Sequence, residues 1–305
     1  MSLAMRDAFG RKLVELGETH PELVVLDADV SSSTKSALFG KAYPDRFFNC
    51  GVAEGNMVDI AAGLATCGYH PVVNAFSIFL ALKGTDQIRN VLCYNNLPVV
   101  IAGAYGGLSD SFDGASHQAI CDIAIMRALP NMQVIVPADA AQAEKALEYA
   151  LGQKGPVFIR LNRNAMPDLP SFEKLGTVCS HEGKDITIAA NGITASFANE
   201  AAQLLSKEGI KAEVLSVPFV KPLDLETLEA SVHKTGRLLC VEEHVLMGGF
   251  ASAISEVFMK RGISCKFDAI GLDDTYGETG PYEELLAKYG ISSENIALRA
   301  RQLCK

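Results

Sequence analysis

One acidic residue stands where a strand is expected to give way to a helix. Glu54 follows the apolar run 46–50, and apolar or small residues recur at helical spacing over 57–65. A carboxylate between two apolar segments costs several kcal/mol to bury unless it is paired or protonated. We therefore expect Glu54 to have a specific partner, and an exposed residue that caps a helix N-terminus is the alternative.

Two polar loops follow predicted buried strands. One spans residues 27–34, and the other spans residues 104–118. Proteins of the α/β class place their ligands at the C-terminal ends of strands. The second loop contains Asp113 and His117, and an imidazole that titrates near neutrality can move protons. Helix capping is the alternative for the first loop, and a cap or surface position is the alternative for His117.

The amino-acid composition limits the classes of protein to which this chain can belong. The chain has 305 residues, enough for two domains, with 49% apolar and 21% charged residues. Its net charge of −9 argues against nucleic acid or an anionic membrane surface as the main partner, although a few arginines can still hold a phosphate. No apolar run long enough to span a membrane and no signal-peptide pattern occurs, so we expect a cytoplasmic protein. The eight cysteines form no Cys-x-x-Cys pair, which favours reduced thiols over a disulfide or zinc framework.

Alternating strand and helix patterns predict two α/β domains, at 1–166 and 186–305, joined by a linker at 167–185. Continuous apolar strands such as 97–103 are typical of parallel sheets, so the expected fold is two three-layer α/β/α domains with mostly parallel sheets. In the first domain we expect strands at 22–26, 46–50, 69–76, 97–103, 134–137 and 157–161, with helices at 4–17, 77–94 and 139–151. In the second we expect strands at 186–190, 212–217 and 237–242, with helices at 194–208, 223–233 and 249–261.

The segment Gly-Val-Ala-Glu-Gly-Asn-Met at 51–57 resembles a segment of transketolases and 1-deoxyxylulose-phosphate synthases. In that family the glutamate of the pyrimidine-binding domain hydrogen-bonds a ring nitrogen of the aminopyrimidine of thiamine diphosphate. The bond favours the imino tautomer, whose nitrogen removes the proton from the thiazolium carbon. The resemblance implies this cofactor and assigns that role to Glu54. It also makes residues 1–166 the pyrimidine-binding domain and residues 186–305 the transketolase C-terminal-like domain.

Further residues match the family's site in the first loop and at the N-terminus. The pair Asp29-Val30 is similar to an Asp-Leu pair, whose aliphatic member supports the bent cofactor from beneath. Ser33 and Arg6 match a serine and an arginine that contact the substrate phosphate. The resemblance therefore implies cofactor binding by Asp29 and Val30, and substrate binding by Ser33 and Arg6.

Phe76 and Phe79 match the phenylalanines that form the pocket for the aminopyrimidine ring, with plain core residues as the alternative. A further aromatic residue of that pocket is replaced here by Thr85.

The sequence Asp-Gly-Ala-Ser-His-Gln at 113–118 is similar to the Asp-Gly-x-Thr-His-Gln of transketolases. The resemblance implies that Asp113 contacts a substrate hydroxyl group, and that His117 bonds the ketol oxygens and moves protons.

The substrate end departs from the family's pattern. Arg163 matches another phosphate-binding arginine, with a solvated arginine at a domain edge as the alternative. Tyr105, however, stands where these enzymes usually have a phosphate-contacting histidine, and Ser111-Phe112 replaces the usual Gly-Glu. A branched or modified ketose phosphate is therefore as credible a substrate as xylulose 5-phosphate.

In the second domain Glu243 and His244 could ligate a metal, but we expect no metal site in this chain.

The chain lacks the Gly-Asp-Gly motif with which enzymes of this class hold Mg²⁺ and diphosphate. It thus resembles the C-terminal subunit of a split transketolase, whose N-terminal subunit would ligate Mg²⁺. The resemblance implies a heterotetramer built on a homodimer core, with thiamine diphosphate between the two kinds of chain, and transfer of a two-carbon ketol unit between sugar phosphates. A 2-oxo acid dehydrogenase β chain and a non-catalytic homologue are the alternatives.

Overall fold

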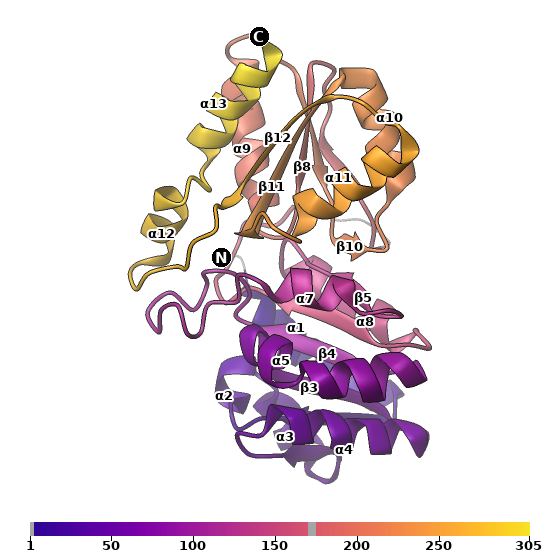
Figure 1. The fold of residues 1–305 in the computed structure, drawn as a ribbon. Helices are drawn as coiled ribbons and strands as arrows, with labels where there is room; N and C mark the ends of the chain where they lie inside the picture. Colours follow the sequence, from indigo (N-terminus) through magenta and orange to yellow (C-terminus); the bar gives the residue numbers. More distant parts are fainter. Residues whose placement is uncertain (1–2, 170–174) are drawn as a thin grey trace.

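A computed structural model describes residues 3–169 and 175–305 (Figure 1). The chain forms two α/β units, one in indigo and magenta and the other in orange and yellow, each built on its own sheet. Both sheets are mostly parallel and covered by helices on two faces, which confirms the predicted fold class. Residues 170–174 of the predicted linker lie outside the described residues.

The first sheet has seven strands in the order β10-β5-β6-β4-β3-β1-β2. All neighbouring pairs are parallel except β10 with β5. Strands β1, β4 and β6 are buried over their whole length, as expected of parallel strands with helices on both faces. The strands are β1 (Leu23–Asp27), β2 (Phe47–Asn49), β3 (His70–Phe76), β4 (Val100–Ala104), β5 (Gln133–Ile135), β6 (Val157–Leu161) and β10 (Phe219–Lys221).

Two helices, α1 (Met5–Thr19) and α8 (Ala140–Leu151), cover one face of this sheet. Asp139 caps α8 by accepting the Gln142 N–H at 2.8 Å, which satisfies one unpaired donor of the first turn. The opposite face is covered chiefly by α4 (Glu54–Thr66), η2 (Ile88–Cys93) and α7 (Asp122–Ala128). Three short helices lie between β1 and β2: α2 (Ser31–Thr34), α3 (Ala37–Ala42) and η1 (Pro44–Arg46).

The prediction of a single helix at 77–94 is wrong in detail. The structure divides this segment into α5 (Ser77–Lys83), α6 (Thr85–Gln87) and the π-helical turn η2. The Thr85 hydroxyl donates to the Ala81 carbonyl, and such back-bonding bends helices. Turns of π-helix inside α-helices are frequent at functional sites.

The second sheet has the order β12-β11-β8-β9-β7, and all pairs are parallel except β7 with β9. Helices α9 and α13 pack together on one face, and α10 and α11 cover the other (Figure 1). Its strands are β7 (Val178–His181), β8 (Ile186–Ala190), β9 (Ala212–Ser216), β11 (Arg237–Val245) and β12 (Lys266–Leu272). Its helices are α9 (Thr194–Ser206), α10 (Leu225–Thr235), α11 (Phe250–Arg261), α12 (Tyr282–Lys288) and α13 (Ser293–Cys304).

The two units share elements and cores. Strand β10 comes from the second half of the chain but joins the first sheet, and β7 lies inside the segment predicted as linker. Each of the two large apolar clusters contains residues from both units, such as Phe9 with Ile188 and Phe158 with Phe250. Burial of apolar surface therefore holds the two units against each other.

The eight cysteines are free thiols, two of them buried. This agrees with the predicted absence of a disulfide framework. Within residues 3–169 and 175–305, no helix combines the length and apolar character that a membrane crossing requires.

Candidate active site

The C-terminal ends of the parallel strands carry most of the predicted site residues. Asp29 and Val30 follow β1, Phe76 ends β3, Tyr105 follows β4 and Arg163 follows β6. Because parallel strands place their carboxyl ends at one edge of a sheet, residues from distant parts of the sequence meet there. The loop between β4 and α7 contributes Asp113 and His117 to the same edge.

Glu54 is the first residue of α4 and only 4% exposed. Its Oε1 atom lies 3.3 Å from Nζ of Lys83, which supplies the expected partner. The N-terminus of α4 adds unpaired N–H groups and the positive end of the helix dipole. Lys83 also lies 4.0 Å from the centre of the Phe79 ring, so one cation contacts two of the predicted cofactor-binding residues, Glu54 and Phe79. Lys83 was not predicted, although its position four residues after Phe79 on a helix is a detectable signal.

Four aromatic rings form one cluster beside this carboxylate. Phe76 stacks on Tyr105 with ring centres 4.7 Å apart, and it lies 5.8 Å from Phe79. The His117 ring packs edge-on against Phe79 at 5.1 Å, and its Nδ1 atom is 3.0 Å from the Ser116 hydroxyl. Apolar ring faces next to a buried carboxylate form a surface suited to a flat heteroaromatic ring with a polar edge.

Two arginines flank Tyr105 on the other side of the cluster. The guanidinium carbons of Arg6 and Arg163 lie 5.4 and 5.0 Å from its ring centre. Arg6 donates hydrogen bonds to the Tyr105 hydroxyl and to the Ser33 carbonyl, so Ser33 contacts it through the backbone. Arg163 forms an ion pair with Asp110 at 3.0 Å. Two guanidinium groups at one end of a site suit a phosphate group.

Asp27, which was not predicted as a site residue, organises the first loop. Its carboxyl group accepts the Val30 N–H at 2.6 Å and the Thr34 and Ser36 hydroxyls at 2.8 Å each. Burial raises the pKa of Asp27, and these three hydrogen bonds oppose that effect. Of the two residues predicted to bind cofactor here, Val30 packs against the apolar core, while exposed Asp29 lies outside the aromatic cluster and bonds Asn49 at 2.8 Å.

A buried polar network joins the site loop to the second unit. Glu243, on β11, accepts the Leu108 N–H at 2.7 Å, the Tyr282 hydroxyl at 2.9 Å and the Asn162 amide at 3.2 Å. Burial raises the pKa of Glu243 to about 7, and the nearby Arg160 guanidinium opposes this shift. Glu243 and His244 are thus engaged in hydrogen bonds with the protein, not grouped as metal ligands.

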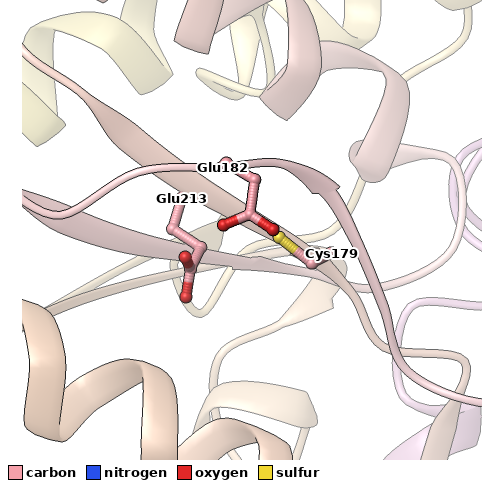
Figure 2. A group of neighbouring side chains, drawn as sticks. All are labelled: Cys179, Glu182 and Glu213. Carbon is pink, nitrogen blue, oxygen red and sulfur yellow. The ribbon is translucent and has the colours of Figure 1, made fainter.

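In the part of the chain that the structure describes, one group of side chains has the spacing of metal ligands: Cys179, Glu182 and Glu213 (Figure 2). Glu213 is already paired with Lys234, whose positive charge opposes a cation. Burial raises the pKa of the Cys179 thiol, whereas metal ligation uses the thiolate. We therefore assign no metal site to this group.

Comparisons with known proteins agree with this geometry. The family model of the transketolase pyrimidine-binding domain matches residues 1–168, and that of the transketolase C-terminal domain matches residues 176–296. A protein of Methanocaldococcus jannaschii assigned as a transketolase C-terminal section is 39% identical over 99% of this chain and 96% of its own length. The 1-deoxy-D-xylulose-5-phosphate synthase of Carboxydothermus hydrogenoformans is 38% identical over 99% of this chain, but the match covers only 49% of that enzyme.

Solved structures give the same result. A split-gene transketolase described as an inactive β4 tetramer superposes with a TM-score of 0.90 at 42% identity, over 100% of this chain and 99% of that one. A transketolase from Pichia stipitis superposes with a TM-score of 0.84 at 23% identity, over 46% of its own chain, which shows the shared fold. The chain thus spans about half the length of the single-chain relatives that it matches.

Proposed function

Because the chain belongs to the transketolase family, we propose that it is the C-terminal subunit of a split, thiamine diphosphate-dependent transketolase that transfers a two-carbon ketol unit between sugar phosphates. The observation that carries the proposal is a buried carboxylate, Glu54, beside an aromatic cluster with two arginines at its far end. We divide the chain into a pyrimidine-binding domain at 1–166, a linker at 167–185 and a C-terminal domain at 186–305.

Glu54 and the aromatic rings fit the pyrimidine half of the cofactor. Thiamine diphosphate supplies a carbon nucleophile that accepts and releases the ketol unit. In our proposal Glu54 binds a ring nitrogen of the aminopyrimidine, and Phe76 and Phe79 contact the ring faces. Val30 and Asp29 support the cofactor from the first loop, which Asp27 holds in place. We assign the Mg²⁺ and diphosphate half to the partner, since this chain has no Gly-Asp-Gly motif.

The substrate would enter at the arginine end of the site. His117 belongs to the aromatic cluster and lies on the loop between β4 and α7, where we propose that its imidazole holds or moves a proton at the ketol oxygens. Asp113 is exposed and free to accept a substrate hydroxyl group. The phosphate group is bound by the cationic end of the site, which we assign to Arg6, Ser33, Tyr105 and Arg163.

We propose that a partner chain completes the cofactor site. We propose an N-terminal transketolase subunit and a heterotetramer with a homodimer of this chain at its centre. Two observations support this: the chain matches 96% of the length of a transketolase C-terminal section, and it matches 99% of a 42% identical chain of a split-gene transketolase. In this proposal, cofactor binding and turnover both require the two chains together.

Tyr105 favours a second candidate, a transketolase-like enzyme acting on a branched or modified ketose phosphate. Its hydroxyl is bonded to Arg6 and its ring lies close to both arginines, so it changes the shape of the phosphate end. The relatives of this chain include 1-deoxy-D-xylulose-5-phosphate synthases beside a transketolase C-terminal section, so similar chains belong to differently named enzymes. A panel of ketose phosphates decides between the candidates, because equal rates on ordinary pentose phosphates would exclude a changed pocket.

The decisive experiment measures ketol transfer from xylulose 5-phosphate to ribose 5-phosphate. The assay contains this chain, the product of the adjacent gene, thiamine diphosphate and Mg²⁺. We expect turnover only with both chains, and Glu54→Gln should lower kcat by roughly 10²–10⁴-fold. Asp59→Asn, which alters an exposed acid on the same helix, is the matched control and should leave kcat unchanged. A mixture that binds no thiamine diphosphate would overturn the proposal in favour of a non-catalytic homologue.

A further inference from the structure

A buried carboxylate, Asp122, joins two walls of the candidate site. It is the first residue of α7, and one of its oxygens, Oδ2, accepts two hydrogen bonds. The Ser77 hydroxyl donates to this oxygen at 2.5 Å, and Nε of Arg160 donates to it at 2.8 Å. All three side chains are at most 5% exposed, so water does not compete for these bonds. The roles assigned above to the site residues do not include this group.

The first arm of the link is Ser77, at the start of the aromatic wall. Ser77 is the first residue of α5, the helix that also carries Phe79 and Lys83. This helix packs against α7 and β4 (Figure 1). Gly103 on β4 leaves room for the Ser77 hydroxyl, because a Cβ atom there would lie 2.7 Å from Ser77 Oγ. The bond to Asp122 therefore holds the beginning of the helix that supplies one wall of the proposed cofactor pocket.

The second arm is Arg160, at the end of the loop that carries His117. Nη2 of Arg160 donates to the Ala119 carbonyl at 2.7 Å and to the Glu243 carbonyl at 2.9 Å. Ala119 lies two residues after His117, whose ring packs edge-on against Phe79 at 5.1 Å. One guanidinium group thus fixes the end of the loop, while the His117 ring touches α5.

We propose that Asp122 is a positioning residue, which fixes α5 relative to the His117 loop and so sets the contact between Phe79 and His117. Both arms end on the same carboxylate oxygen, so a displacement of one arm moves the other. A charged acceptor strengthens both bonds, and a site is held in its working geometry by such supporting contacts. The effect on thiamine diphosphate rests on the proposed function, but the coupling of Ser77 to His117 does not.

Ser77→Ala tests the link most cleanly, because it removes one oxygen atom and leaves the ion pair of Asp122 with Arg160 intact. Removal of either charged partner would strand a buried charge, which is strongly destabilising. Asp122→Asn is the conservative variant, since its amide oxygen can still accept from Ser77 and Arg160. The matched control is Ser231→Ala, because Ser231 is also a buried serine, bonded to the Thr187 hydroxyl at 2.6 Å, but lies on α10 of the second unit.

The first readout uses this chain alone and needs no turnover. ¹H–¹³C NMR of histidine-labelled protein follows the imidazole signal of His117, with His117→Gln to assign it. The ring current of Phe79 shifts this signal, so the signal reports the position of α5 against the loop. We expect Ser77→Ala to move the signal toward its position in Phe79→Leu. Asp122→Asn and Ser231→Ala should leave it near the wild-type position.

Three results would overturn the positioning role. The first is a His117 signal that is the same in Ser77→Ala and in the wild type. The second is a shift in Asp122→Asn or Ser231→Ala as large as that in Ser77→Ala, because the retained oxygen or the distant site should protect the geometry. The third is a Ser77→Ala chain that does not fold in a thermal unfolding experiment, because the hydroxyl would then support the fold as a whole.

The second readout uses the complex with the partner chain and separates cofactor affinity from substrate binding. We expect Ser77→Ala to raise the apparent Kd for thiamine diphosphate by about tenfold, the size of one hydrogen bond to a charged group. KM for the ketose phosphate should stay unchanged, because the arginine end of the site is not touched. A raised KM at an unchanged Kd would contradict the proposal. If no ketose phosphate reacts, the proposed function fails, while the His117 signal still decides the link.

Discussion

Glu243 accepts the backbone N–H of Leu108 at 2.7 Å, across 135 residues of sequence and between the two α/β units. Leu108 lies in the loop that begins with Tyr105 and continues to Asp113 and His117. A strand of the second unit therefore fixes the start of the loop that carries the proposed substrate-binding residues. The second unit thus contributes to the site without lying on the ligand-binding edge of the first sheet.

Loss of the Glu243 carboxylate should loosen this loop. In Glu243→Ala the Leu108 N–H, the Tyr282 hydroxyl and the Asn162 amide lose their acceptor, which should cost roughly 2–4 kcal/mol of unfolding free energy. Hydrogen exchange of peptides from 105–121 should become faster than in the wild type. The exposed residue Glu283 offers the control variant Glu283→Ala. Unchanged exchange in Glu243→Ala would contradict the anchoring role.

Gly107 should tolerate no side chain. Its φ of +68° is unfavourable for other residues, and a Cβ atom there would overlap the Glu243 carboxyl group. Gly107→Ala should cost more unfolding free energy than Gly209→Ala, where φ is +83° and no atom lies within 4 Å. Gly209→Ala carries the backbone strain alone, about 1–2 kcal/mol. Urea unfolding measures the difference, which should shrink when both glycine variants are compared in a Glu243→Ala background.

Tyr105→Phe should weaken substrate binding and leave cofactor binding intact. The change removes the hydroxyl that accepts from Arg6 but keeps the ring that stacks on Phe76. A hydrogen bond to a charged group contributes about 1.5–3 kcal/mol, so kcat/KM for a ketose phosphate should fall by roughly 10–100-fold. Steady-state kinetics and thiamine diphosphate titrations test the two halves of this prediction. Tyr94→Phe, at an exposed tyrosine, serves as the control.

His244 should make the protein less stable at acidic pH. Burial lowers the pKa of His244 to about 4, and its Nδ1–H donates to the Val245 carbonyl at 2.6 Å. Below its ordinary value of 6.5 the unfolded chain binds a proton that the folded chain does not, so stability falls as pH drops from about 6.5 to about 4. The full contribution is on the order of 3 kcal/mol.

Chemical denaturation at pH 7 and pH 5 checks this prediction. The variant His244→Gln has no titrating group there, so its loss of stability between the two pH values should be smaller than that of the wild type. Burial raises the pKa values of Glu242 and Glu243 to about 7, so these residues contribute a pH dependence of opposite sign. That contribution cancels when the loss of stability of the variant is subtracted from the loss of stability of the wild type. The exposed His233 gives the control His233→Gln, which should lose as much stability as the wild type.

Local sequence patterns were sufficient for nine of the twelve strands that the structure describes, all but β7, β10 and β12, and for the sheet edge that carries the candidate site. Continuous apolar runs such as 97–103 identify buried parallel strands, and loops that follow such strands meet at one edge of a sheet. The same reasoning identified Glu54 as a carboxylate between a strand and a helix that needs a partner. The helices α12 and α13 were not predicted, and the helix at 77–94 is interrupted because Thr85 bonds the Ala81 carbonyl.

The sequence by itself determined the α/β class, the resemblance to transketolases and the residue types at the site, because these depend on periodicity and on short motifs. Only the tertiary structure decided the partners of those residues. Lys83 beside Glu54, Asp110 beside Arg163 and Glu243 at Leu108 are contacts between separate elements. No local pattern encodes such contacts, because they arise when burial of apolar surface brings distant segments together and each buried polar group must then find a partner.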